Sequence, residues 1–136
     1  MRFYYLIFIL GLFYLYSCSD GIVSECSTDG SVKVNSNFTS IQKNVFNKSC
    51  ALSGCHSGSF PAANLNLTEG NAYKNIVNVQ STGDYKYILP GNSSESYLFQ
   101  KISSNETGFA MPPTGKLQQH IIDSIKVWID NGALNN

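Results

Sequence analysis

The chain has 136 residues, and its nine Lys and Arg side chains balance nine Asp and Glu side chains, so the formal net charge is zero. This length suits one small domain with a modest core, not a multidomain enzyme. Without a basic cluster that could neutralise a phosphate backbone, the charge pattern argues against a nucleic-acid partner.

The first residues are typical of an export signal. After Met1 and Arg2, residues 3–16 form an apolar run without charge or proline, shorter than the roughly 20 residues of a stable membrane span. The run ends in Leu15-Tyr16-Ser17-Cys18, which resembles the bacterial lipobox. The resemblance implies a lipoprotein signal peptide over residues 1–17 and a lipid on Cys18. The alternatives are an ordinary signal peptide with a chance cysteine, or an uncleaved anchor.

Residues 18–37 form the expected tether, because they are rich in Ser, Asp, Gly and Asn and carry few large apolar side chains. Four cysteines in an exported chain would ordinarily suggest two disulfides. With a lipid on Cys18 three remain, and any pairing of Cys50 with Cys55 leaves Cys26 over. We therefore predict Cys26 to be a free or intermolecularly paired thiol.

From residue 38 onward, apolar residues recur at helical spacing and predict four helices, over residues 38–48, 70–78, 94–103 and 117–131. No alternating strand pattern is evident, so the expected fold class is small all-α. The last helix should end at Gly132 in the C′ position. The side chains predicted to point inward are Phe38, Ile41, Val45, Phe46, Tyr73, Ile76, Val77, Tyr97, Leu98, Ile102, Leu117, Ile121, Ile125, Trp128 and Ile129.

Directly after the first predicted helix, the segment Cys50-Ala-Leu-Ser-Gly-Cys55-His56 places an imidazole beside two thiols. In a haem-attachment motif each thiol adds across a vinyl group and the histidine binds the iron; the usual spacer is two residues, and here it is four. A Cys50–Cys55 disulfide with a loop histidine is the alternative. Zinc needs four ligands, and the other candidates, Cys26 and His120, are distant in sequence.

Met111 is the only methionine besides the initiator, and Pro112-Pro113 follow it. Two prolines hold the backbone extended and non-helical, which suits a loop that presents a thioether sulfur to a metal. The alternative is a core methionine that fills a gap. The competing ligand, His120, projects about 140° from the apolar stripe of the last helix, so we predict it to face solvent.

The order of these features resembles the class I cytochrome c domains, in particular the planctomycete-type cytochrome c domain of bacterial lipoproteins. The resemblance covers residues 38–133, although Gln118 stands where such domains usually have a Ser, Thr or Asp helix cap. It implies thioether attachment at Cys50 and Cys55, a proximal ligand in His56 and a distal ligand in Met111. The residues that carry it are Ile41, Phe46, Cys50, Cys55, His56, Leu65-Asn66-Leu67, Pro90-Gly91, Ser96, Leu98, Met111-Pro112 and Trp128-Ile129-Asp130-Asn131-Gly132-Ala133.

The expected architecture is thus a cytochrome c-like fold of about four helices around one covalently attached haem c. The expected function is electron transfer without catalysis, by a lipid-anchored protein facing redox partners in the bacterial cell envelope, periplasmic or on the outer-membrane surface. The alternatives are a non-redox interaction module with a Cys50–Cys55 disulfide, and a haem sensor or enzyme fragment in which Met111 is unbound. Apolar side chains should exclude water from the haem: Phe46, Leu98, Phe109, Ile125 and Trp128.

Overall fold

We describe residues 33–106 and 108–136 of a computed structural model of the chain. The predicted signal peptide, Cys18, Cys26 and most of the predicted tether lie outside these residues. Within them the structure is helical, and β pairing is limited to isolated bridges: Val77–Ile88, Gln80–Lys86 and Leu89–Asn92. The helix-rich, strand-free arrangement agrees with the predicted all-α class.

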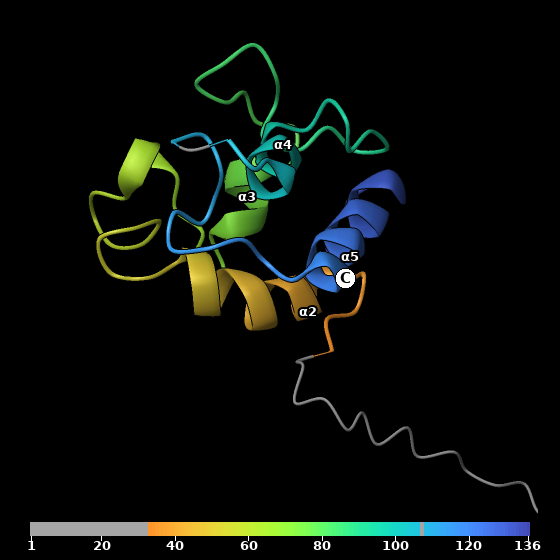
Figure 1. Ribbon diagram of the computed structural model, residues 1–136, viewed down its shortest axis with the longest axis horizontal. Helices are drawn as coiled ribbons and strands as arrows, with labels where there is room; N and C mark the ends of the chain where they lie inside the picture. Colours follow the sequence, from red (N-terminus) through yellow and green to blue (C-terminus); the bar gives the residue numbers. More distant parts are fainter. Residues whose placement is uncertain (1–32, 107) are drawn as a thin grey trace, which may run out of the picture. The chain divides into compact units, whose positions relative to one another are not determined.

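The first helix starts as α2, Phe38–Ile41, and continues directly into a π-helix, η1, Gln42–Cys50 (Figure 1). Asn37 caps its start, because its side-chain oxygen accepts a hydrogen bond from the Ser40 amide at 2.8 Å. The predicted helix is therefore confirmed, and it extends as far as Cys50. Its π geometry was not predicted from the apolar spacing.

The next two predicted helices are shorter than predicted: α3 spans Ala72–Ile76 and α4 spans Tyr97–Ser103. A 3-10 turn, η2, at Ala62–Asn64 was not predicted. The late start of α4 has a local cause. The Asn92 side chain accepts hydrogen bonds from Ser94 Oγ and the Glu95 amide, and Ser96 Oγ donates to the Asn92 carbonyl. These polar residues build a separate turn in front of the helix.

The last helix, α5, spans Gln119–Asp130 and ends as predicted. Gly132, at φ +95°, donates its amide to the Ile129 carbonyl, and the Ala133 amide donates to the Trp128 carbonyl. This is the Schellman arrangement, in which a left-handed glycine closes the helix end. Ile121 of the predicted apolar stripe is partly buried and packs against the core, whereas Ile122, buried at 2% exposure, was not predicted to be buried.

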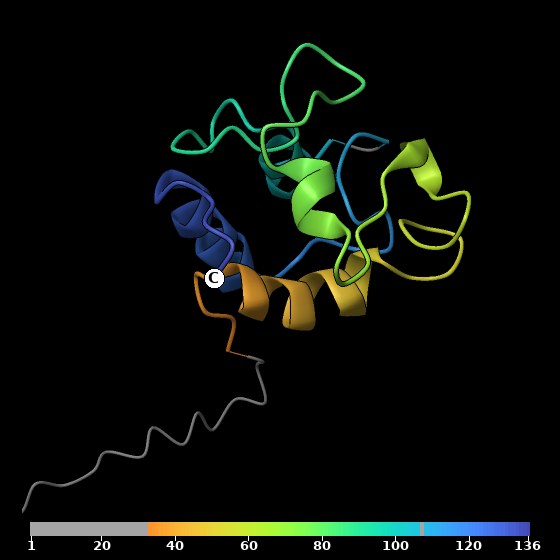
Figure 2. The ribbon, with the colours of Figure 1, turned by 180° about the vertical axis from the view of Figure 1, so that it is seen from behind.

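Helices α2 and η1 run along one side of the fold, with α3, α4 and α5 above them in both views (Figures 1 and 2). Phe38 joins these elements, because its ring contacts those of Phe46, Tyr73 and Trp128 at centroid distances of 5.1–6.4 Å. The core therefore lies between α2–η1, α3 and α5. Within the described part of the chain, no helix has the length and apolarity needed to cross a bilayer.

Candidate haem-binding site

The loop between Cys50 and His56 bulges outward and brings its two ends together. The His56 amide donates a hydrogen bond to the Cys50 carbonyl at 3.1 Å, and the Cys55 amide donates to the Leu52 carbonyl at 3.0 Å. Leu52 is 45% exposed, and Gly54 adopts a left-handed φ of +78°, a conformation that glycine tolerates best. The four-residue spacer thus forms a compact turn at the end of η1.

The orientation of the His56 ring is fixed by two backbone carbonyls. Its Nδ1 lies 3.1 Å from the Ala62 carbonyl oxygen and 3.2 Å from the Leu65 carbonyl oxygen. A carbonyl can only accept a hydrogen bond, so Nδ1 carries the proton in the neutral ring and Nε2 keeps its lone pair. This tautomer is the one that binds a metal through Nε2, with the second nitrogen anchored by the protein.

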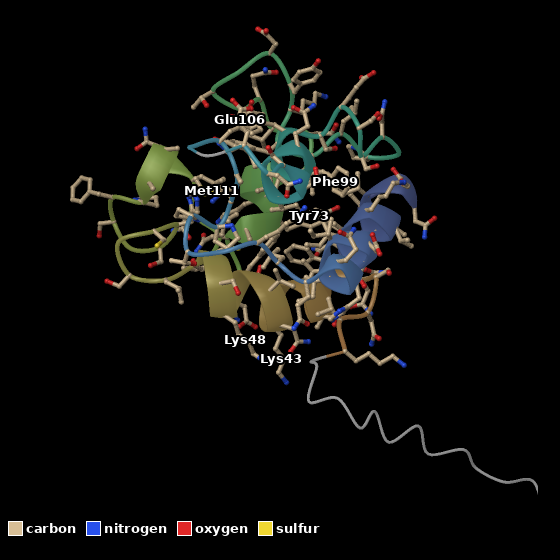
Figure 3. All side chains as sticks on the ribbon, viewed as in Figure 1. Lys43, Lys48, Tyr73, Phe99, Glu106 and Met111 are labelled. Carbon is tan, nitrogen blue, oxygen red and sulfur yellow. The ribbon has the colours of Figure 1, made fainter. Side chains whose placement is uncertain are left out.

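Met111 lies on the loop between α4 and α5, and Figure 3 shows it on the side of the fold where the loop of residues 51–64 lies. Its amide donates a hydrogen bond to the Lys101 carbonyl at 2.8 Å, which ties this loop to the last turn of α4. Upstream of it, the amides of Phe109 and Ala110 both donate to the Glu106 carbonyl, which forms a tight turn before Met111.

Cys50, Cys55, His56 and Met111 all line one cavity of about 320 Å³. This volume is within the usual range of cofactor and ligand pockets, about 300–1,000 Å³. The wall is mainly apolar, and its aliphatic and aromatic side chains include Val45, Phe46, Leu65, Leu67, Leu98 and Ile125. The fold therefore brings together the four residues that the sequence singled out, although 55 positions separate His56 from Met111 (111 − 56).

Both cysteines at the cavity are free thiols in the structure. Burial, with a smaller contribution from the neighbouring Cys55, raises the pKa of the Cys50 thiol to about 12. Cys50 is consequently protonated near neutral pH, and a protonated thiol is a poor nucleophile for disulfide exchange.

Two of the expected water-excluding side chains do not line the cavity. Trp128 is buried against Phe38, and Phe109 is half-buried and packs against Tyr97. The prediction for both rests on apolar character alone, which does not distinguish the cavity wall from the rest of the core. His120 is exposed, as predicted from its position on α5, and is absent from the cavity wall.

Several cavity residues were not predicted as such, among them Lys101, Tyr87 and Tyr97. Tyr87 is buried, and this burial together with the nearby Tyr97 raises the pKa of its hydroxyl above the ordinary value. Lys101 is the one Lys, Arg, Asp or Glu side chain among the described residues that line the cavity. Lys101 and Tyr97 are four residues apart in a predicted helix, and this spacing could have indicated that they share a helix face.

Residues 53–115 match the family described as Planctomycete cytochrome C. This match supports a planctomycete-type cytochrome c domain in this part of the chain. The matched region includes Cys55, His56 and Met111, whereas Cys50 and α5 lie outside it. No curated protein and no solved structure matches the chain.

The family match suggests haem binding, and the chemistry of the cavity fits a haem. His56 offers an unprotonated nitrogen, Met111 a thioether, and the wall is apolar around them. The predicted lipid-bearing Cys18 and the predicted free thiol Cys26 lie outside the described residues, so their roles remain predictions from sequence.

Proposed function

We propose that this protein is a monohaem c-type cytochrome that transfers electrons, with His56 and Met111 as the axial ligands of the iron. The observation that carries the proposal is that both residues line the same cavity, with His56 Nδ1 anchored on two carbonyls. A haem bound there would supply a one-electron iron couple. If His56 and Met111 both ligate the iron, no coordination site would remain for a substrate, so we propose a carrier and not an enzyme.

The protein groups around the iron favour a raised reduction potential. A thioether opposite an imidazole raises the potential relative to two stronger donors. The apolar wall excludes water and disfavours the additional positive charge of the ferric state. The two backbone carbonyls that accept from His56 hold its ring in one orientation, which would limit rearrangement of the proximal ligand between the two oxidation states.

We propose that Cys50 and Cys55 each form a thioether with the haem. In each reaction the S–H bond breaks, sulfur bonds to one vinyl carbon, and the proton ends on the other, so no oxidant is needed. The hydrogen bond from the His56 amide to the Cys50 carbonyl supports attachment of the haem through both cysteines. It holds the two ends of the loop together despite the longer spacer, which keeps Cys50 close to Cys55.

The cellular setting is proposed from the sequence. A lipid on Cys18 would hold the domain at a membrane of the bacterial cell envelope, with residues 18–37 as a tether, outside the cytoplasm. Redox proteins in the same compartment would be its partners. Radiolabelled palmitate incorporation, compared between the wild-type chain and Cys18→Ala, tests this part independently of the haem.

The haem proposal is tested by expressing the full chain with haem-maturation machinery and assaying pyridine haemochrome. We expect one covalent haem per chain, and mass spectrometry of the Cys50–His56 peptide should show one haem adduct with two sulfur links. Cys50→Ser and Cys55→Ser should each retain a single link. A peptide lighter by two hydrogens and free of haem would instead establish the disulfide of a non-redox module.

A further inference from the structure

Lys101 makes an aromatic contact at the rim of the cavity. Tyr97 and Lys101 stand four residues apart on α4 and share one helix face, where both line the cavity. Phe109 returns to this face from the following loop and packs edge-to-face on Tyr97, with centroids 6.0 Å apart. The Lys101 ammonium lies 4.0 Å from the Phe109 ring centroid and 5.8 Å from that of Tyr97, within the range of cation–π attraction.

The same residue also holds the neighbouring backbone. The Lys101 carbonyl accepts the hydrogen bond from the Met111 amide at 2.8 Å. Lys101 thus contacts the loop at two points, through its side chain at Phe109 and through its backbone at Met111, with Ala110 between them. Among the described residues the salt bridge is formed by Lys126 and Asp130 and does not involve Lys101. The Lys101 ammonium therefore interacts with the two rings and not with a carboxylate.

We propose that Lys101 is a positioning residue for Met111: its cation–π contact with Phe109 latches the loop that carries the distal ligand. This inference rests on the proposed ligation of the haem iron by Met111. When the latch is closed, the loop lies against α4 and the thioether stays at the cavity. When it opens, Met111 leaves more readily and the distal position accepts an external ligand.

Imidazole binding to the purified ferric holoprotein measures this opening, because imidazole can bind only where Met111 has left. Its apparent affinity is the intrinsic affinity multiplied by the open fraction. Lys101→Met keeps an unbranched side chain of similar reach and removes the cation. Since a cation–π contact at a partly exposed site contributes modestly, we expect the apparent imidazole affinity to rise about two- to fivefold.

Three further variants separate positioning from general destabilisation. Lys101→Arg keeps the cation and should restore wild-type imidazole affinity. Phe109→Leu removes the ring and its packing on Tyr97 as well, so it should raise the imidazole affinity at least as much as Lys101→Met. The double variant should add little to Phe109→Leu, because that change already removes the Lys101–Phe109 contact. Lys43→Met removes the same charge from the exposed surface of η1, away from Met111 in Figure 3, and should leave imidazole binding unchanged.

The outcomes distinguish this inference from the proposed function. Unchanged imidazole affinity in Lys101→Met, an equal change in Lys43→Met, or additive effects of Lys101→Met and Phe109→Leu would each overturn the latch. A wild-type holoprotein with covalent haem but without the Met–iron charge-transfer absorption would overturn the ligand role of Met111, and the latch with it. A wild-type chain without covalent haem would overturn the proposed function itself.

Discussion

The amide of His56 donates its hydrogen bond to the carbonyl of Cys50, six residues earlier. This single contact shows how a four-residue spacer keeps the motif compact. The additional residues project outward as an exposed turn, and the imidazole stays at the end of the helix that delivers the first thiol. In this chain the four-residue spacer therefore leaves both thiols and the imidazole at one cavity.

Gly54 should tolerate substitution poorly for a purely conformational reason. A Cβ added there would meet no neighbouring heavy atom, but its φ of +78° strains an L side chain. We expect Gly54→Ala to lower the free energy of unfolding by about 1 kcal/mol, measured by urea denaturation. Gly83→Ala, where no positive φ occurs and the nearest contact is an ordinary 3.8 Å, should cost less. Equal costs would contradict the argument from backbone strain.

Met111→Leu should keep the fold and lose the sixth ligand. Leucine approximates the volume of methionine but cannot coordinate iron, and the backbone bond to Lys101 remains. The Met–iron charge-transfer absorption should disappear and the reduction potential should fall. His120→Ala, on the exposed surface of α5, should retain both properties. A wild-type protein that lacks this absorption, and whose visible spectrum changes in His120→Ala but not in Met111→Leu, would exchange the two assignments.

Ile122 and Ile121 provide a matched test of which side of α5 is buried. Ile122 is 2% exposed, and Ile121 packs only partly against the core. Ile122→Ala should lower the free energy of unfolding by about 2–5 kcal/mol, as expected for a buried isoleucine. Ile121→Ala should cost clearly less in the same urea titration. A larger cost for Ile121→Ala than for Ile122→Ala would contradict the assignment of Ile122 as the more buried residue.

Asp130 should contribute a small, acid-sensitive stabilisation. The hydrogen bond from Lys126 lowers the pKa of the Asp130 carboxyl, and the Ser93 amide also donates to it. Because the folded-state pKa lies below the unfolded value, the contribution is present above the ordinary pKa and is lost as pH falls through the lowered one. Asp130→Asn and Lys126→Met should each cost about 0.5 kcal/mol or less at neutral pH, since the pair is exposed.

This pH dependence is measured by repeating urea unfolding between neutral and acidic pH. The difference between the wild-type chain and Asp130→Asn should shrink as the solution is acidified. A difference that is constant across this range would show that the pair does not couple folding to protonation. In the Asp130→Asn variant the side-chain amide oxygen can still accept from the Ser93 amide, which would leave the turn before α4 in place.

Helical periodicity predicted where helices exist but not how they begin or what geometry they take. The end of α5 was predictable because Gly132 acts locally through its positive φ. The start of α4 was not, because Asn92 and Ser96 hydrogen-bond among themselves before the helix begins. The π-helix leading to Cys50 was also missed, since hydrogen bonds between residues five apart, in place of four, leave no distinct signal in apolar spacing.

Within the candidate site, the predicted side chains were those whose chemistry is rare in this sequence. Met111 is the single methionine after the initiator, and His56 directly follows a cysteine. Lys101 was missed because one lysine among eight carries no such signal. Its proximity to Phe109 depends on the path of the intervening loop, which only the tertiary structure defines.

The far end of the chain is joined to the start of the first helix. Asn136 accepts hydrogen bonds from the Phe38 amide through its side chain and from the Thr39 amide and hydroxyl through its carbonyl. Residues almost a hundred positions apart thus complete one helix cap together. The fold is consequently suited to circular permutation: a short linker from residue 136 to residue 33, with new ends opened in the exposed turn at residues 82–84, would leave every cavity-lining element except that turn intact.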